Sequence, residues 1–170
     1  MNTTNKVEYL YDAMGNKLAK RVDGIAAATE YYMGDVVLKG TLFGVEYLLT
    51  PEGRATKSSG LYTYEYHLKD HLGNTSVVFT DENNDNTPEV LQVDNYYPFG
   101  MRHGQANAFS AGGNTTQYMY NGKELQQDFN LDWYDYGARM YDAALGRFHT
   151  QDRFAEKYHT MSPYQYAANN

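Results

Sequence analysis

Hydrophobic and polar positions alternate along residues 9–22, which read YLYDAMGNKLAKRV. Tyr9 and Tyr11 share one face if this segment is extended, because successive side chains of a β-strand point to opposite faces. Asp12 and Gly15 follow with the spacing of the first and fourth residues of a type I turn, where Asp and Gly are preferred. The pattern predicts a β-hairpin whose turn lies between these two residues.

The same order of residues recurs at two other places along the chain. Residues 64–79 read YEYHLKDHLGNTSVVF and repeat the spacing, and residues 134–148 read YDYGARMYDAALGRF with the spacing one residue longer. The turn residues are Asp70 and Gly73 in the first copy and Asp142 and Gly146 in the second. Such internal repetition indicates a hairpin module that is used several times.

Other strands are predicted where β-favouring residues are bounded by turn signals. They cover residues 36–49, 90–97 and 118–120, and the last of these leads into the turn pair Asn121-Gly122. Polar segments at 51–60, 81–88 and 104–117 are expected to be loops. Helical patterns are short and limited to residues 123–128 and 154–158. The predicted class is all-β, with sequential antiparallel hairpins and one or two short helical turns.

Composition narrows the possible functions. The net charge of -7 argues against a nucleic-acid partner, whose phosphates require clustered Lys and Arg. There is no cysteine, so neither a disulfide framework nor a thiolate metal site is possible. No apolar run is long enough for a membrane span, and residues 1–10 do not read as a signal peptide. The 18 Tyr residues suit a sheet surface that is only partly dry.

These motifs together resemble the YD repeats and the repeat-associated core of Rhs proteins of the Bacteroidetes type. The core resemblance lies in YMYNGKELQQD from Tyr118, LDWYDYGARMYDAALGRFHTQD from Leu131, and SPYQYAANN at the end. It divides the chain into YD-repeat-like hairpins at 1–117 and a core segment at 118–170, expected to form one continuous β structure. The residues that carry the motifs are Tyr9, Tyr11, Asp12, Gly15, Asp70, Gly73, Asn121, Gly122, Trp133, Tyr134, Tyr136, Arg139, Tyr141, Asp142, Gly146, Arg147, Phe148 and Asp152.

The resemblance implies an architecture and a role. Members of this family wind hairpins into a hollow shell that encloses or presents a C-terminal toxin or effector. The expected partners are therefore the rest of the shell and that toxin domain, together with self-association through sheet edges. The resemblance implies no enzymatic activity and no cofactor, and it implies a place outside the cell or on its surface as part of a larger protein.

The chain departs from the family pattern in three ways. It is too short to close a shell, it ends at Asn169-Asn170 where the family continues into Pro, and Asp152-Arg153 stands where the core often has Asp-Pro. The first two departures predict a fragment, an orphan cassette or a truncated form. Family members often cut themselves just after the core, with aspartates near an Asp-Pro-x-Gly-Leu segment downstream of the Asn-Asn-Pro position. That segment is absent from this sequence, so we expect no self-cleavage here.

Two sets of side chains are candidates for metal binding. Asp81, Asn83 and Asp85 alternate like the oxygen ligands of a calcium loop, but the Gly and Glu that complete such a loop are missing. Asp and Asn are also common in ordinary polar turns, and a polar turn is the favoured interpretation of these three residues. His67 and His71 straddle a strand and a turn, so their rings should not converge on a metal.

Five aromatic residues at 133–148 suggest the alternative function. Trp133, Tyr134, Tyr136, Tyr141 and Phe148 could form an exposed platform, which would make the chain a cell-surface carbohydrate-binding module. Cross-strand packing of hairpin neighbours is the favoured interpretation of the same residues. A third possibility, an enzyme with a carboxylate pair, selects no particular residues because 21 carboxylates are available.

Overall fold

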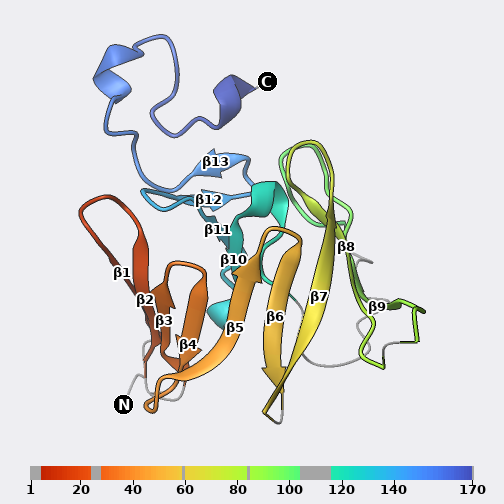
Figure 1. Ribbon diagram of the computed structural model, residues 1–170. Helices are drawn as coiled ribbons and strands as arrows, with labels where there is room; N and C mark the ends of the chain where they lie inside the picture. The colour runs from red at the N-terminus through yellow and green to blue at the C-terminus, as the bar shows by residue number, and fades with distance from the viewer. Residues whose placement is uncertain (1–4, 24–27, 59, 84, 104–115, 170) are drawn as a thin grey trace.

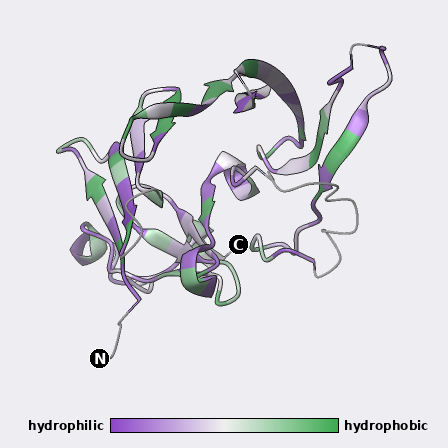
Figure 2. Ribbon diagram, turned by 90° about the horizontal axis from the view of Figure 1, so that it is seen from below, coloured by the Kyte–Doolittle hydropathy of each residue, from purple (hydrophilic) through white to green (hydrophobic). Residues whose placement is uncertain are grey.

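The computed structural model describes residues 5–23, 28–58, 60–83, 85–103 and 116–169. Its largest element is a nine-stranded antiparallel sheet in which the strands lie side by side in sequence order. The sheet is a curved strip, and the C-terminal part of the chain lies on the inner side of the curve (Figure 1, Figure 2). The strands are β1 (Val7–Tyr11), β2 (Lys17–Val22), β3 (Glu30–Met33), β4 (Val36–Lys39), β5 (Gly44–Thr50), β6 (Gly53–Ser58), β7 (Leu61–Lys69), β8 (Thr75–Thr80) and β9 (Glu89–Val93).

The C-terminal part forms a second antiparallel sheet of four strands, also in sequence order. Its strands are β10 (Glu124–Gln126), β11 (Trp133–Asp135), β12 (Met140–Asp142) and β13 (Arg147–Phe148). The helical elements among the described residues are the single 3₁₀ turns η2 (Tyr120–Gly122), η3 (Asp128–Asn130), η4 (Ala155–Lys157) and η5 (Ala167–Asn169). The predicted all-β class of sequential hairpins is confirmed. None of the described helices is long and apolar enough to cross a membrane.

The hairpin turns follow from the Asp and Gly residues that predicted them. In the β7–β8 turn, the Gly73 N–H donates to the Asp70 carbonyl at 3.0 Å, and the Asp70 carboxylate accepts the N–H groups of Leu72 and Asn74. Residues 12–16 repeat each of these contacts between β1 and β2. Both turn glycines have a φ of more than +80°, which residues with a Cβ rarely adopt.

Two element assignments made from the sequence are wrong. Residues 123–128 contain strand β10 instead of a helix, because residues 124–126 pair with strand β11. Residues 51–60 contain strand β6 instead of a loop, since this polar segment pairs with β5 on one side and β7 on the other. Residues 118–120 form only an isolated bridge at Tyr118 before turn η2 begins.

The other short predictions fall as follows. Residues 81–88 connect β8 to β9 as a loop, and residues 154–158 contain the single turn η4. The loop predicted at 104–117 lies almost wholly outside the described residues. The division at residue 117 remains a prediction, although the nine-stranded sheet ends at Val93 and the second sheet begins at Glu124.

The two faces of the strip differ in polarity, and strand β7 shows this difference. On β7, Glu65 and His67 are buried on the inner face of the strip, while Tyr64 and Leu68 on the outer face are more than half exposed. Polar and charged residues therefore fill much of the inner face. Some of them have polar partners there, such as Arg54 and Glu65, which form an ion pair, whereas His67 Nε2 and Gln92 Oε1 have no hydrogen-bond partner among the described residues.

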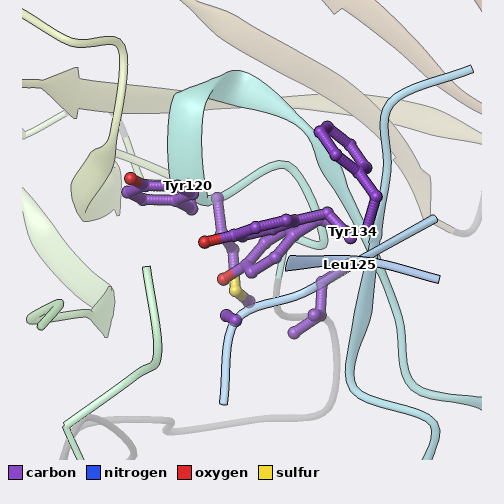
Figure 3. Close-up of a cluster of buried hydrophobic side chains, with 7 residues drawn as sticks. Tyr120, Leu125 and Tyr134 are labelled. Atoms are coloured by element: carbon purple, nitrogen blue, oxygen red, sulfur yellow. The ribbon is translucent and has the colours of Figure 1, made fainter. Parts of the chain in front are cut away.

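A cluster of buried apolar side chains lies within the C-terminal part, and Val37, Ala55 and Val78 of the strip are buried as well. Seven buried residues form this cluster: Met119, Tyr120, Leu125, Tyr134, Tyr141, Ala143 and Phe148 (Figure 3). The hydroxyls of Tyr120, Tyr134 and Tyr141 donate to backbone carbonyls of residues 98–100. Tyrosine is suited to these positions because its ring packs in the core while its hydroxyl finds a partner at the core's boundary.

Candidate functional site

A group of buried charges joins the first hairpin to the second sheet. Glu124 and Asp135 lie directly opposite each other on β10 and β11, so their side chains share one face. The Lys17 Nζ from β2 lies between them, 2.6 Å from a Glu124 oxygen and 2.8 Å from an Asp135 oxygen. The three side chains are only 10%, 5% and 5% exposed. We call these three residues the Lys17 triad.

Tyrosine hydroxyls and one backbone amide hold the triad in place. Tyr11 donates to Asp135 Oδ2 at 2.9 Å, and Tyr32 donates to Glu124 Oε1 at 2.8 Å. The Gly137 N–H donates to the other Asp135 oxygen at 2.7 Å. Burial, followed by the nearby carboxylates, raises the pKa of both Tyr11 and Tyr32 well above the usual range, so both hydroxyls remain donors.

The triad forms the floor of an open cleft of about 810 Å³. The other residues that line it come from the β1–β2 turn, the β3–β4 turn, the η2 turn before β10 and the β11–β12 turn. Gly34 and Gly137 at these turns have positive φ values and bear no side chain that would narrow the opening. The residues that line the cleft include Asn16, Leu18, Met33, Tyr118 and Lys123.

A second buried lysine, Lys20, lies three residues further along β2, and the register shift at Leu10 and Tyr11 keeps it on the same face as Lys17. The Lys20 Nζ is 3.0 Å from Glu30 and 3.2 Å from Asp128, and its side chain is 3% exposed. Burial alone would lower the pKa of Lys20, but the neighbouring carboxylates outweigh it and raise that pKa. The contacts of Lys20 with Glu30 and Asp128 connect β2 and β3 to turn η3.

Asn121 connects the strip to the aromatic core. Its backbone N–H donates to Asn74 at 2.8 Å, and its side-chain amide donates to the Leu72 carbonyl at 3.2 Å. The side-chain oxygen accepts hydrogen bonds from the hydroxyls of Tyr136 and Tyr166, at 2.8 Å and 2.6 Å. One residue of the predicted Asn-Gly turn thus fastens the β7–β8 turn to the core.

The predicted aromatic patch is mainly packed in the interior. Tyr134, Tyr141 and Phe148 are buried in the core, and Tyr136 packs edge-on against the Tyr141 and Phe148 rings. Trp133 is partly buried against His149, with ring centroids 3.9 Å apart. The packing interpretation therefore holds for most of this patch, and it leaves little of it available as a platform.

The remaining core-motif residues serve turns and ion pairs. Arg139 stacks on the Phe148 ring at 3.7 Å and lies 3.0 Å from the Asp152 carboxylate. The Asp142 carboxylate accepts backbone N–H groups inside its own turn, as does Asp152. Gly146 at the end of the Asp142 turn has a φ of +65°, and the exposed Arg147 begins β13.

The two metal candidates lie in different surroundings. Asp81, Asn83 and Asp85 use their side-chain oxygens to accept backbone N–H groups within the β8–β9 loop. His67 is buried on the inner face, whereas His71 is exposed in the β7–β8 turn. Within the described ranges there is no group of three or more His, Cys, Asp or Glu residues that could hold a metal ion.

Sequence reasoning did not identify the Lys17 triad or Lys20. Their partners lie on strands that are remote in the sequence, so no local spacing reveals the contacts. One signal was present: Tyr11 and Lys17 are paired across the first hairpin and therefore share a face. A lysine on the same face as two tyrosines is a weak sign that it is buried.

No protein-family model matches the chain. Among curated proteins, Salivary gland surface protein 1 of Aedes aegypti is 29% identical over 188 aligned residues, which cover 96% of this chain and 5% of that protein. The chain thus spans about one-twentieth of the length of this relative.

Solved structures give a much clearer likeness. The crystal structure of TcdB2-TccC3 matches 97% of the chain with a TM-score of 0.70 at 17% identity, over 9% of its own chain. The Tc holotoxin pore of Photorhabdus luminescens matches all of the chain with a TM-score of 0.66 at 16% identity, again over 9%. The chain therefore shares its fold with a segment of each of these two structures, and the shared fold agrees with the predicted strip of β-hairpins.

Proposed function

We propose that the chain is a segment of an Rhs-type shell that encloses or presents a C-terminal toxin or effector, and that it catalyses no reaction on a separate substrate. The observation that supports this most is the in-order strip of nine strands, which has the fold of the toxin-complex chains. In this proposal the chain acts in a larger secreted or surface protein. The Bacteroidetes-type core at 118–170 is the part that would meet the cargo.

The structure offers a physical basis for such a role. Each hairpin pairs only with its neighbours, so a strip of this kind grows in one dimension and can curve around a volume. The outermost strands of the described strip, β1 and β9, leave edges to which further strands can pair. The C-terminal part lies on the inner side of the curve, where it would close off an enclosed space (Figure 1).

Protease protection tests this function. The native gene product that contains this sequence would be digested under native conditions and again after mild denaturation. A cargo region outside residues 1–170 should resist the protease until denaturant opens the shell. Equal cleavage of that region under both conditions, or a native product with no such region, would rule out encapsulation.

The second candidate, carbohydrate binding, retains one supporting observation. Tyr62, Tyr64 and Tyr66 form an exposed row on the outer face of β7. A glycan array with the purified chain tests this candidate. Saturable binding that is lost in Tyr64→Ala and kept in Tyr158→Ala, a similarly exposed tyrosine elsewhere, would favour it over the shell role.

A further inference from the structure

The Lys17 triad places a primary amine in contact with two carboxylates inside the protein. Its distances are 2.6 Å to Glu124 and 2.8 Å to Asp135, and all three side chains are at most 10% exposed. A buried ion pair contributes little to stability because desolvation offsets the attraction between the charges. The same arrangement has a chemical use, since an amine and a carboxyl group in contact can condense.

We propose that Lys17 and Asp135 become joined by an isopeptide bond, with Glu124 acting as the proton carrier. The Lys17 Nζ forms a bond to the Asp135 Cγ, and one Cγ–O bond of Asp135 breaks. Of the three ammonium protons, one stays on the new amide and two leave with the Asp135 oxygen as water. One of these two protons passes directly from the Lys17 ammonium to the Asp135 oxygen that it contacts, and Glu124 accepts the other from the attacking nitrogen, passes it to the departing oxygen and ends unchanged. No electrons are transferred, and no co-reactant is required.

The hydrogen bonds around the triad fit these separate roles. The Gly137 N–H contacts Asp135 Oδ1 at 2.7 Å, where it would stabilise the negative charge of the tetrahedral intermediate. Lys17 and Tyr11 both contact the other oxygen, Oδ2, which would be the one to leave. Tyr32 holds Glu124 Oε1, so Oε2 faces the Lys17 amine. Asp135 is therefore the acyl group, and Glu124 is the proton carrier.

The surroundings favour condensation over a lasting ion pair. The Lys17 Nζ and the Asp135 carboxylate are held 2.8 Å apart in a site from which most water is excluded. Groups held in contact react with effective concentrations of about 10⁵–10⁸ M when their orientation is right. The cleft above the triad gives the released water a path to the solvent.

Lys20 offers an internal comparison within the same strand. Its carboxylate partners lie at 3.0 Å and 3.2 Å, and the Asp128 oxygen nearest to it accepts no hydrogen bond that would orient it. A lysine between two carboxylates is thus present twice on β2, but only Lys17 has a fully oriented acyl group and proton carrier. We expect Lys20 to remain unmodified.

The bond would give a protein without cysteine a covalent tie between distant parts of its chain. It would join β2 of the strip to β11 of the second sheet and close a loop of more than a hundred residues. Closing such a loop restricts the unfolded chain and thereby stabilises the folded one. This inference rests on the triad and does not depend on the proposed shell function.

Intact-mass spectrometry of the purified, folded chain tests the proposal. The wild-type protein should be lighter than its 19.4 kDa sequence by one water, and a digest should contain a branched peptide that joins Lys17 to Asp135. Lys17→Arg and Glu124→Gln should have their full sequence masses and lower melting temperatures. Lys20→Arg is the matched control and should still lose one water.

The proposal is overturned by a wild-type protein of full sequence mass after long incubation at neutral pH, which would make the triad an ordinary ion cluster. A branched peptide at Glu124, or water loss that persists in Lys17→Arg, would overturn it equally. Circular dichroism checks that the variants fold. If Glu124→Gln does not fold, Tyr32→Phe keeps the carboxylate but frees it from its hydrogen bond, and it should slow the loss of water.

Discussion

Single residues at the turns set the direction of whole strands, and Gly73 is the clearest case. Its φ is +82°, while an added Cβ would meet only ordinary contacts, the nearest being the Asn121 carbonyl carbon at 3.8 Å. The cost of Gly73→Val is therefore backbone strain, about 1–3 kcal/mol. Thermal denaturation should show a clear fall in melting temperature. Gly44→Val, at an exposed strand position without positive φ, is the control and should change little.

A buried histidine gives the protein a measurable pH dependence. Burial, followed by the charges of Arg54 and Lys69, lowers the pKa of His67 from 6.5 to about 4. The unfolded chain then binds a proton at a higher pH than the folded one, so stability decreases as the pH falls from 6.5 to about 4. The loss is at most about 1.4 kcal/mol per pH unit. In His67→Gln, urea denaturation across this range should lose that slope, and an unchanged slope would place the effect on other groups.

Residues were predictable from the sequence where their chemistry is local. Asp70 and Gly73 form the hydrogen bonds of a single turn, so their spacing and residue types were enough to predict that turn. The roles of Lys17 and Asn121 were not predictable, because each depends on side chains that reach it only after the two sheets pack together. The sequence showed Asn121 as half of a turn and gave no sign of its hydrogen bonds to Tyr136 and Tyr166.

At the scale of elements, the pairing of strand β6 with β7 includes one buried ion pair. Arg54 on β6 and Glu65 on β7 are cross-strand partners, 2.7 Å apart at the nearest atoms and almost fully buried. Arg54→Met should cost about 3–5 kcal/mol, because it leaves the Glu65 carboxylate buried without its counter-charge. The double variant Arg54→Met/Glu65→Leu should recover most of this loss in urea denaturation. A double variant less stable than Arg54→Met would contradict the pairing argument.

This pair also explains why β6 was mistaken for a loop. Alternation of apolar and polar residues identifies a strand only when its buried side is apolar, and here the buried side carries Arg54. Residues 123–128 misled in the opposite way, since a short run of helix-favouring residues became strand β10 once β11 was available to pair with it. Both errors arise from tertiary contacts that outweigh local preference.

At the scale of the whole molecule, the nine-stranded strip ends in two outer strands, and these predict self-association. Strands β1 and β9 end the described sheet, and each leaves one row of backbone groups without a partner strand. Sedimentation velocity should show dimers or larger species that increase with concentration. Val90→Lys places a charge on β9 at a half-exposed position and should reduce their amount. A single monomeric species at high micromolar concentration would contradict this prediction.

At the same scale, we expect the isolated chain to remain uncut. Asp152 is the aspartate at the position where the family's core often has Asp-Pro, and both of its carboxylate oxygens are engaged. Oδ1 accepts the Phe154 N–H at 2.8 Å, and Oδ2 lies 3.0 Å from Arg139. A carboxylate cuts a peptide only when it can reach the scissile bond as acid, base or nucleophile, and these contacts hold Asp152 in its own turn. After long incubation between mildly acidic and neutral pH, mass spectrometry should find one unbroken chain. Cleavage and the proposed isopeptide bond are distinguishable in that same spectrum, because one gives two fragments and the other removes one water from an unbroken chain. A discrete pair of fragments that disappears in Asp152→Asn would make the chain an autoprotease.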